Sequence, residues 1–240
     1  MANTFAECLQ ITREGKEIMI KSENINSFIG PEEFKECLAE AMKWYGVYKH
    51  GFDQRDLLPT AAYLVKFLLE RAGFSKRHGA WVCVNGLKRG RGRTDVRKEI
   101  EAIAEVDPYE CMVDIYCGVG KKDPFIPLIT MECEGAAEFS GEVSKSATSE
   151  NCDYLWDLFK LLQVSSPFRV FLALCAEKKT GELQRKICEL VKGYRKHRNP
   201  TDVVYAVVFP WEKLDGETIT VQRWSGRESI CKEYPMALGA

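Results

Sequence analysis

Hydrophobic residues recur along the chain with two different spacings, which predicts an alternation of helices and strands. Apolar positions three and four residues apart predict amphipathic helices, and short continuous apolar runs predict buried strands. On this basis we expect helices over residues 31–46, 57–71, 94–105, 150–163 and 180–198. We expect strands near residues 18–20 and over 80–84, 110–117, 128–134, 168–175, 203–209 and 218–224.

The order of these elements predicts an α/β protein with a central mixed sheet flanked by helices. No linker rich in Pro, Gly or Ser divides the 240 residues, so we expect a single domain over residues 1–240. Residues 1–75 are mainly helical in this interpretation. We expect this N-terminal portion to pack on an α/β core at about residues 76–225.

Three acidic residues lie on two consecutive predicted strands, Asp114 on the first and Glu132 and Glu134 on the second. Because side chains alternate between the faces of a strand, Glu132 and Glu134 share a face. If the polar faces of the two strands align, the three carboxylates converge. Like charges that face one another in a sheet are destabilising, so this arrangement predicts a bound cation. The alternative is an acidic face of a solvent-exposed hairpin.

Basic residues form two local clusters, although the net charge of −1 gives no overall attraction to nucleic acid. The first cluster is a glycine-interrupted run whose backbone could follow a phosphate chain closely. The second ends the helix at 180–198, where cations also suit the helix dipole. As phosphate-binding candidates we name Lys88, Arg89, Arg91, Arg93, Arg195, Lys196 and Arg198. A solvated surface loop is the alternative for the first cluster.

The remaining composition restricts the class of protein further. The ten cysteines include no Cys-x-x-Cys pair, which favours reduced thiols in a cytoplasmic protein over a disulfide framework or zinc site. The chain has no Gly-x-Ser-x-Gly motif, so a serine hydrolase of that type is not expected.

No apolar run approaches the roughly 20 residues that a membrane-spanning helix needs. We therefore expect no membrane association.

The order of Asp114, a loop, Glu132-Cys133-Glu134, a helix and the strand at 168–175 resembles the core of the PD-(D/E)xK, or restriction endonuclease-like, superfamily. The resemblance covers roughly residues 55–175. Glu134 stands where most members have Lys, an E-x-E form that some restriction enzymes of this fold also use. The Pro that usually precedes the Asp is missing.

The resemblance implies a restriction endonuclease-like core in which Asp114 and Glu132 bind Mg²⁺ or Mn²⁺ and Glu134 orients the attacking water. It also implies Glu70 as a further metal ligand, and Lys145 is the candidate for a displaced lysine. The implied function is metal-dependent hydrolysis of DNA phosphodiester bonds. Two alternatives remain open. One is a catalytically inactive module of the same fold that binds nucleic acid or a protein partner; the other is a phosphoesterase acting on small substrates. DNA is the expected partner, and a homodimer is left open.

Overall fold

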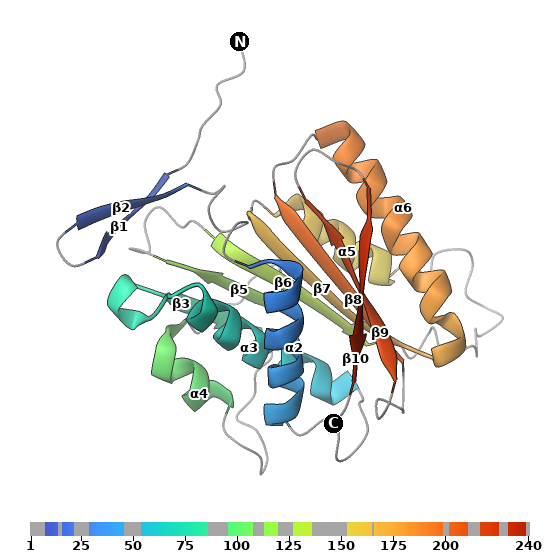
Figure 1. Cartoon of the computed structure of the whole chain (residues 1–240), viewed down its shortest axis with the longest axis horizontal. Coiled ribbons are helices and arrows are strands. Elements are labelled where there is room, and N and C mark those ends of the chain that lie inside the picture. Colours follow the sequence, from blue (N-terminus) through green and yellow to red (C-terminus); the bar gives the residue numbers. More distant parts are fainter. Residues whose placement is uncertain are drawn as a thin grey trace.

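An eight-stranded mixed sheet with helices on its two faces forms the body of the protein (Figure 1). The structure is a computed structural model, and it describes residues 8–13, 16–21, 29–45, 54–85, 96–107, 113–119, 127–135, 153–164, 166–198, 202–210, 217–225 and 230–238. The strand order in the sheet is β10-β9-β8-β7-β6-β5-β3-β4. The predicted α/β class and the mixed sheet flanked by helices are confirmed.

Three parallel strands form the centre of the sheet, namely β6 (Pro127–Gly135), β7 (Phe168–Cys175) and β8 (Val203–Pro210). Every residue of β7 and β8 is buried. Their sequences are almost continuously apolar, as expected for strands that are covered on both faces. The antiparallel neighbours are β5 (Ile115–Gly118) beside β6 and β9 (Thr218–Trp224) beside β8.

The helices form one layer on each face of the sheet (Figure 1). One layer contains α2 (Pro31–Tyr45), α3 (Gln54–Arg71) and α4 (Val96–Ile103), whose buried side chains share a core with one face of the central strands. The other contains α5 (Asp153–Gln163) and α6 (Thr180–Arg198), which cover the opposite face. The N-terminal helices thus pack directly on the sheet.

Several edge elements differ from the sequence-based prediction. The structure adds β10 (Lys232–Ala237), which pairs with β9, and β4 (Glu105–Asp107), which pairs with β3 (Trp81–Val84). Both lie at ends of the sheet, where exposed polar residues weaken the apolar pattern that reveals a strand. Glu105 therefore belongs to a strand, whereas the prediction placed it at the end of a helix. A separate hairpin of β1 (Cys8–Arg13) and β2 (Lys16–Lys21) lies apart from the main sheet (Figure 1).

Helix α3 begins three residues earlier than predicted, at Gln54. Pro59 consequently lies in its second turn and not in the first, where a proline is best tolerated. The helix accommodates it because the following residues, from Ala61 to Leu69, are all buried against the sheet and neighbouring helices. Tertiary packing here outweighs the lost backbone hydrogen bond. No described helix is long and apolar enough to cross a bilayer.

Candidate functional site

Asp114 directly precedes β5 and lies in contact with Glu132 of β6. The backbone N–H of Asp114 donates to Oε2 of Glu132 over 3.3 Å, and the N–H of Cys133 donates to Oδ2 of Asp114 over 2.8 Å. The antiparallel pairing of β5 and β6 sets this proximity, since Ile115 lies opposite Met131. The residues that flank this pair are Asp114, just before β5, and Glu132 in β6.

Asn85, at the end of β3, holds the backbone of the Asp114 segment in place. Its own N–H donates to the carbonyl of Asp114 over 2.7 Å. Its side-chain Nδ2 donates to the carbonyl of Val113 over 2.8 Å. The Val113 side chain is buried against the α5–α6 layer. Asp114 therefore sits on a fixed backbone between two strands of the sheet.

Helix α5 adds Asp157 and Lys160 to the two acids. The Nζ atom of Lys160 lies 3.4 Å from Oε1 of Glu132, and it also forms an ion pair with Asp157. Asp157 and Lys160 are three residues apart on the helix, so their side chains lie on the same surface. The group that we call the carboxylate–lysine cluster therefore consists of Asp114, Glu132, Asp157 and Lys160.

Glu132 is the most unusual residue of this cluster because only 4% of its surface is exposed. Burial raises the pKa of its carboxyl group from 4.5 to about 8, with a further contribution from Asp114. Lys160 acts in the opposite direction and lowers that pKa. The Oε1 atom of Glu132 is buried, and among the described residues its contact is the ion pair with Lys160. Lys160 is therefore the cation that compensates this buried oxygen, and it is shared with Asp157.

The pKa of Lys160 is raised, so its ammonium stays charged. Burial alone would lower the pKa, but contacts with Asp157 and Glu132 outweigh that effect. The cluster nevertheless sets three carboxyl groups against one ammonium. A proton on Glu132 or a second cation would reduce this excess of negative charge.

Glu134 lies two residues beyond Glu132 on the same face of β6 and is half-buried. The pKa of the neighbouring Cys133 thiol is raised well above its ordinary value, first by burial and then by Asp114, Glu132 and Glu134. All three acids therefore act on this point of the strand. Within the described parts of the chain, however, no three His, Cys, Asp or Glu side chains are placed to hold one metal ion. Of these acids, Asp114 and Glu132 are joined by a hydrogen bond from the backbone N–H of Asp114 to Oε2 of Glu132.

Glu70 lies elsewhere, near the end of α3 in the layer on the opposite face of the sheet. Burial raises its pKa; Lys66 lowers it, and Glu40 and Glu99 raise it further. These neighbours belong to α2, α3 and α4. The structure therefore does not bring Glu70 to the carboxylate–lysine cluster, and its predicted role as a metal ligand there is not supported.

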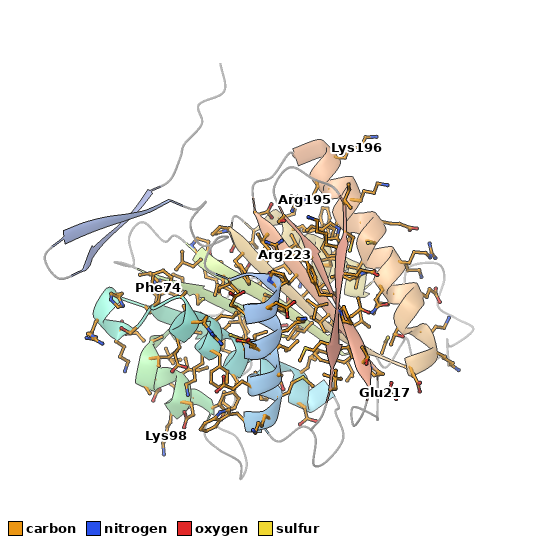
Figure 2. All side chains as sticks on the ribbon, viewed as in Figure 1. Phe74, Lys98, Arg195, Lys196, Glu217 and Arg223 are labelled. Carbon is orange, nitrogen blue, oxygen red and sulfur yellow. The ribbon has the colours of Figure 1, made fainter. Side chains whose placement is uncertain are left out.

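The basic candidates have different outcomes. Arg195 is buried at 2% exposure, and its guanidinium binds the side chain and the carbonyl of Asp202, so it holds α6 to the sheet and offers no surface to a phosphate. Lys196, the next residue, is exposed on the outer side of α6 (Figure 2). Arg198 ends α6, but its side chain is outside the described residues. The other candidates, Lys88, Arg89, Arg91, Arg93 and Lys145, also lie outside the described residues.

Lys160 and Asp157 were not identified from the sequence. Both fall in the predicted helix 150–163, where the amphipathic pattern assigns polar residues to solvent by default. Their spacing of three residues was compatible with an ion pair but not specific for one. Only the packing of α5 across β6 shows that this edge of the helix faces Glu132.

Comparisons with protein-family models, curated proteins and solved structures found no match. The function is therefore inferred from the site itself. Asp114 and Glu132 supply oxygen ligands only, and Oε1 of Glu132 is a buried acceptor that lacks a hydrogen-bond partner. Mg²⁺ commonly binds to one or two carboxylates and completes its shell with water and substrate phosphate. The residues present thus fit Mg²⁺ or Mn²⁺ better than zinc.

Proposed function

We propose that the protein is a metal-dependent nuclease that hydrolyses phosphodiester bonds in DNA, with Asp114 and Glu132 as metal ligands. The observation that carries the proposal is the buried Oε1 of Glu132 beside a second acid and a lysine. Burial of such a group is costly unless it is compensated, and here the one compensating lysine is shared with Asp157. An acid with a strongly raised pKa and specific charged partners is typical of functional sites.

A divalent ion held by these two carboxylates would polarise the phosphoryl oxygen and lower the pKa of a coordinated water. Asp114 is positioned for this role by its fixed backbone and by the Cys133 N–H, which orients one of its two carboxylate oxygens. Glu132 contributes Oε1, while its Oε2 accepts the N–H of Asp114. The two ligands are therefore held by the sheet and do not depend on a surface loop.

Lys160 supplies the ammonium that the sequence motif lacks at position 134. Its Nζ lies 3.4 Å from Glu132, so it can donate to a phosphate oxygen bound beside that carboxylate. The half-buried Glu134 is placed further along the same strand face, where it could accept a hydrogen bond from the attacking water. We assign the displaced-lysine role to Lys160 in preference to Lys145.

The order of elements around the site supports a restriction endonuclease-like core as part of the proposal. Asp114 precedes β5, the Glu132–Glu134 pair lies on the adjacent β6, and α5 and the parallel β7 follow. The antiparallel pair is β5 and β6, and α5 then connects β6 to the parallel strand β7. This arrangement brings acids from two strands to one helix. The same fold can host inactive binding modules, so the chemistry must be tested directly.

Plasmid cleavage tests the proposal. Supercoiled plasmid and single-stranded DNA are each incubated with the wild-type protein in Mg²⁺, in Mn²⁺ or in EDTA, and the Asp114→Ala variant and the small phosphodiester bis-p-nitrophenyl phosphate are tested in the same way. We expect cleavage of DNA in Mg²⁺ or Mn²⁺, no cleavage in EDTA, and a loss of at least about 100-fold in the variant.

The outcomes separate the alternative functions. DNA retention without cleavage, unchanged in Asp114→Ala, would indicate a non-catalytic binding module. Hydrolysis of the small diester without DNA cleavage would indicate a phosphoesterase. Cleavage that persists unchanged in Asp114→Ala would contradict the assigned site. Circular dichroism of the variant shows whether it has retained its fold.

A further inference from the structure

Two aromatic side chains, Trp156 and Phe159, are exposed side by side on α5. Trp156 is 61% exposed and Phe159 is 40% exposed. Their ring centroids are 5.7 Å apart with an interplanar angle of 24°, so the rings are stacked on one another. The other exposed large hydrophobic side chains of the described residues are Trp44 and Ile230, which lie on α2 and just before β10. The pair on α5 is thus the one place among the described residues where two such side chains adjoin.

The aromatic pair adjoins the carboxylate–lysine cluster. Trp156 is four residues before Lys160, and residues at this spacing are neighbours on a helix surface, with Cβ atoms about 5–6 Å apart. Phe159 immediately precedes Lys160, and Asp157 immediately follows Trp156. At 100° per residue the side chains follow one another around the helix in the order Phe159, Trp156, Lys160 and Asp157, and the last two are the ones that reach the cluster with Glu132. A substrate phosphate held at Glu132 and Lys160 would lie about one helical turn from the exposed indole.

The composition of the patch argues against a protein-docking helix face. Such faces present apolar side chains at positions i, i+3 or i+4, and i+7. Here position i+7 from Trp156 is Gln163, which is exposed and polar, and the flanking Asp157 and Lys160 carry charges. Among the described residues of α5, the exposed large apolar side chains are therefore these two stacked rings. Flat aromatic faces beside charged groups match the surface of a nucleic-acid base next to its phosphate.

We propose that Trp156 and Phe159 form a stacking platform for an unpaired base adjacent to the phosphate at the carboxylate–lysine cluster. This inference rests on the proposed nuclease function and specifies its substrate: single-stranded DNA, or a strand end or flap that leaves a base unpaired. Bases inside an intact duplex are already stacked on their neighbours and do not present a face to the indole. Every base can stack on an aromatic side chain. We therefore expect the platform to distinguish single-stranded from duplex DNA and not one base from another.

Binding of matched oligonucleotides tests this inference. Fluorescence anisotropy is measured with a fluorescein-labelled 20-nucleotide single strand and with the blunt duplex of the same sequence, with Ca²⁺ in place of Mg²⁺. The variants are Trp156→Ala, Phe159→Ala and Trp156→Phe, which retains a ring. Ile230→Ala is the matched control, because Ile230 is 66% exposed and lies outside α5.

For Trp156→Ala we expect binding of the single strand to weaken by about 10-fold, within the range found for loss of one base-stacking side chain. Phe159→Ala should weaken binding to a smaller extent, and Trp156→Phe should remain within about threefold of the wild type. Binding of the duplex should be unchanged in all variants, and Ile230→Ala should behave as the wild type with both ligands. Because the substituted side chains are exposed, the variants are expected to keep the fold.

Unchanged single-strand binding in Trp156→Ala would overturn the stacking inference, as would an equal loss for single strand and duplex. The nuclease proposal is judged separately, by metal-dependent cleavage of plasmid or of the same single strand in Mg²⁺ and by its loss in Asp114→Ala. Plasmid cleavage combined with unchanged single-strand binding would therefore reject the platform alone. Ring-dependent single-strand binding without metal-dependent cleavage would reject the nuclease alone.

Discussion

A Glu132→Gln substitution is expected to abolish cleavage while it stabilises the metal-free protein at pH 8. The amide removes a metal ligand, so the rate of plasmid cleavage should fall by about 1,000-fold or more, as when an essential catalytic group is lost. The same change removes a carboxyl group whose pKa is raised from 4.5 to about 8 in the folded protein, mainly by burial. Loss of function and gain of stability should therefore appear in one variant.

The sign of the stability effect follows from proton linkage. Between pH 4.5 and pH 8 the folded state keeps the Glu132 proton that the unfolded state releases, so the free energy of unfolding falls as pH rises. Each pKa unit corresponds to about 1.4 kcal/mol, so the penalty at pH 8 amounts to a few kcal/mol. Gln cannot ionise and avoids this loss. Urea denaturation in EDTA at pH 5 and pH 8 measures the difference between the two proteins.

Glu189→Gln is the matched control, because Glu189 is exposed and pairs only with Arg185 one helical turn away. We expect its free energy of unfolding to lie within about 0.5 kcal/mol of the wild type at both pH values. Its cleavage activity should be unchanged. A Glu132→Gln variant that is less stable than the wild type at pH 8 would show that Glu132 is a satisfied structural acid. A variant that still cleaves DNA would remove it from the metal site.

Replacement of Lys160 by Ala is expected to reduce the rate of DNA cleavage by about 100- to 1,000-fold, comparable to the loss of one donor that stabilises the transition state. The ammonium lies 3.4 Å from Glu132 and is the cation that contacts two acids of the cluster. If it donates to the phosphate during reaction, the loss should appear in kcat more than in KM. Lys160→Arg should not restore full activity, since a planar guanidinium places its donors differently.

Lys160→Ala should also shift the pH dependence of DNA cleavage to higher pH. Lys160 lowers the pKa of Glu132, so its removal raises that pKa and delays ionisation to higher pH. The residual activity is therefore expected to reach half its maximum at a higher pH than in the wild type. Lys178→Ala is the control, because Lys178 is exposed between β7 and α6. Equal activity of Lys160→Ala and Lys178→Ala would contradict the role of Lys160.

The central part of the fold could be predicted from the sequence because its strands are doubly covered. Runs such as Phe168–Cys175 and Val203–Pro210 are apolar throughout, and the helices between them show a clear three-and-four spacing. The edge strands β4 and β10 lack this signal, since exposed positions tolerate polar residues. Alternation along the predicted strands also suggested that Asp114 and Glu132 converge, and they are in contact, although Asp114 lies just before β5 and not on the strand itself.

The cation partner could not be predicted because it depends on how α5 crosses β6. Periodicity tells which helix face is buried, but not which strand residue lies beneath its boundary. The reverse problem applies to Arg195. Its basic neighbours suggested an exposed cluster, whereas a single acid beyond the helix, Asp202, draws its guanidinium into the interior. Long-range pairs of this kind leave no local pattern in the sequence.

Calorimetric titration of Mg²⁺ at pH 7, in two buffers that differ in their enthalpy of ionisation, tests the metal site most directly. With a pKa of about 8, Glu132 is mostly protonated in the metal-free protein at this pH. Metal binding requires a deprotonated ligand and so releases that proton. The account predicts one bound ion per chain and release of about one proton per ion, both lost in Glu132→Gln. Binding without proton release, or binding that is unchanged in Glu132→Gln, would contradict it.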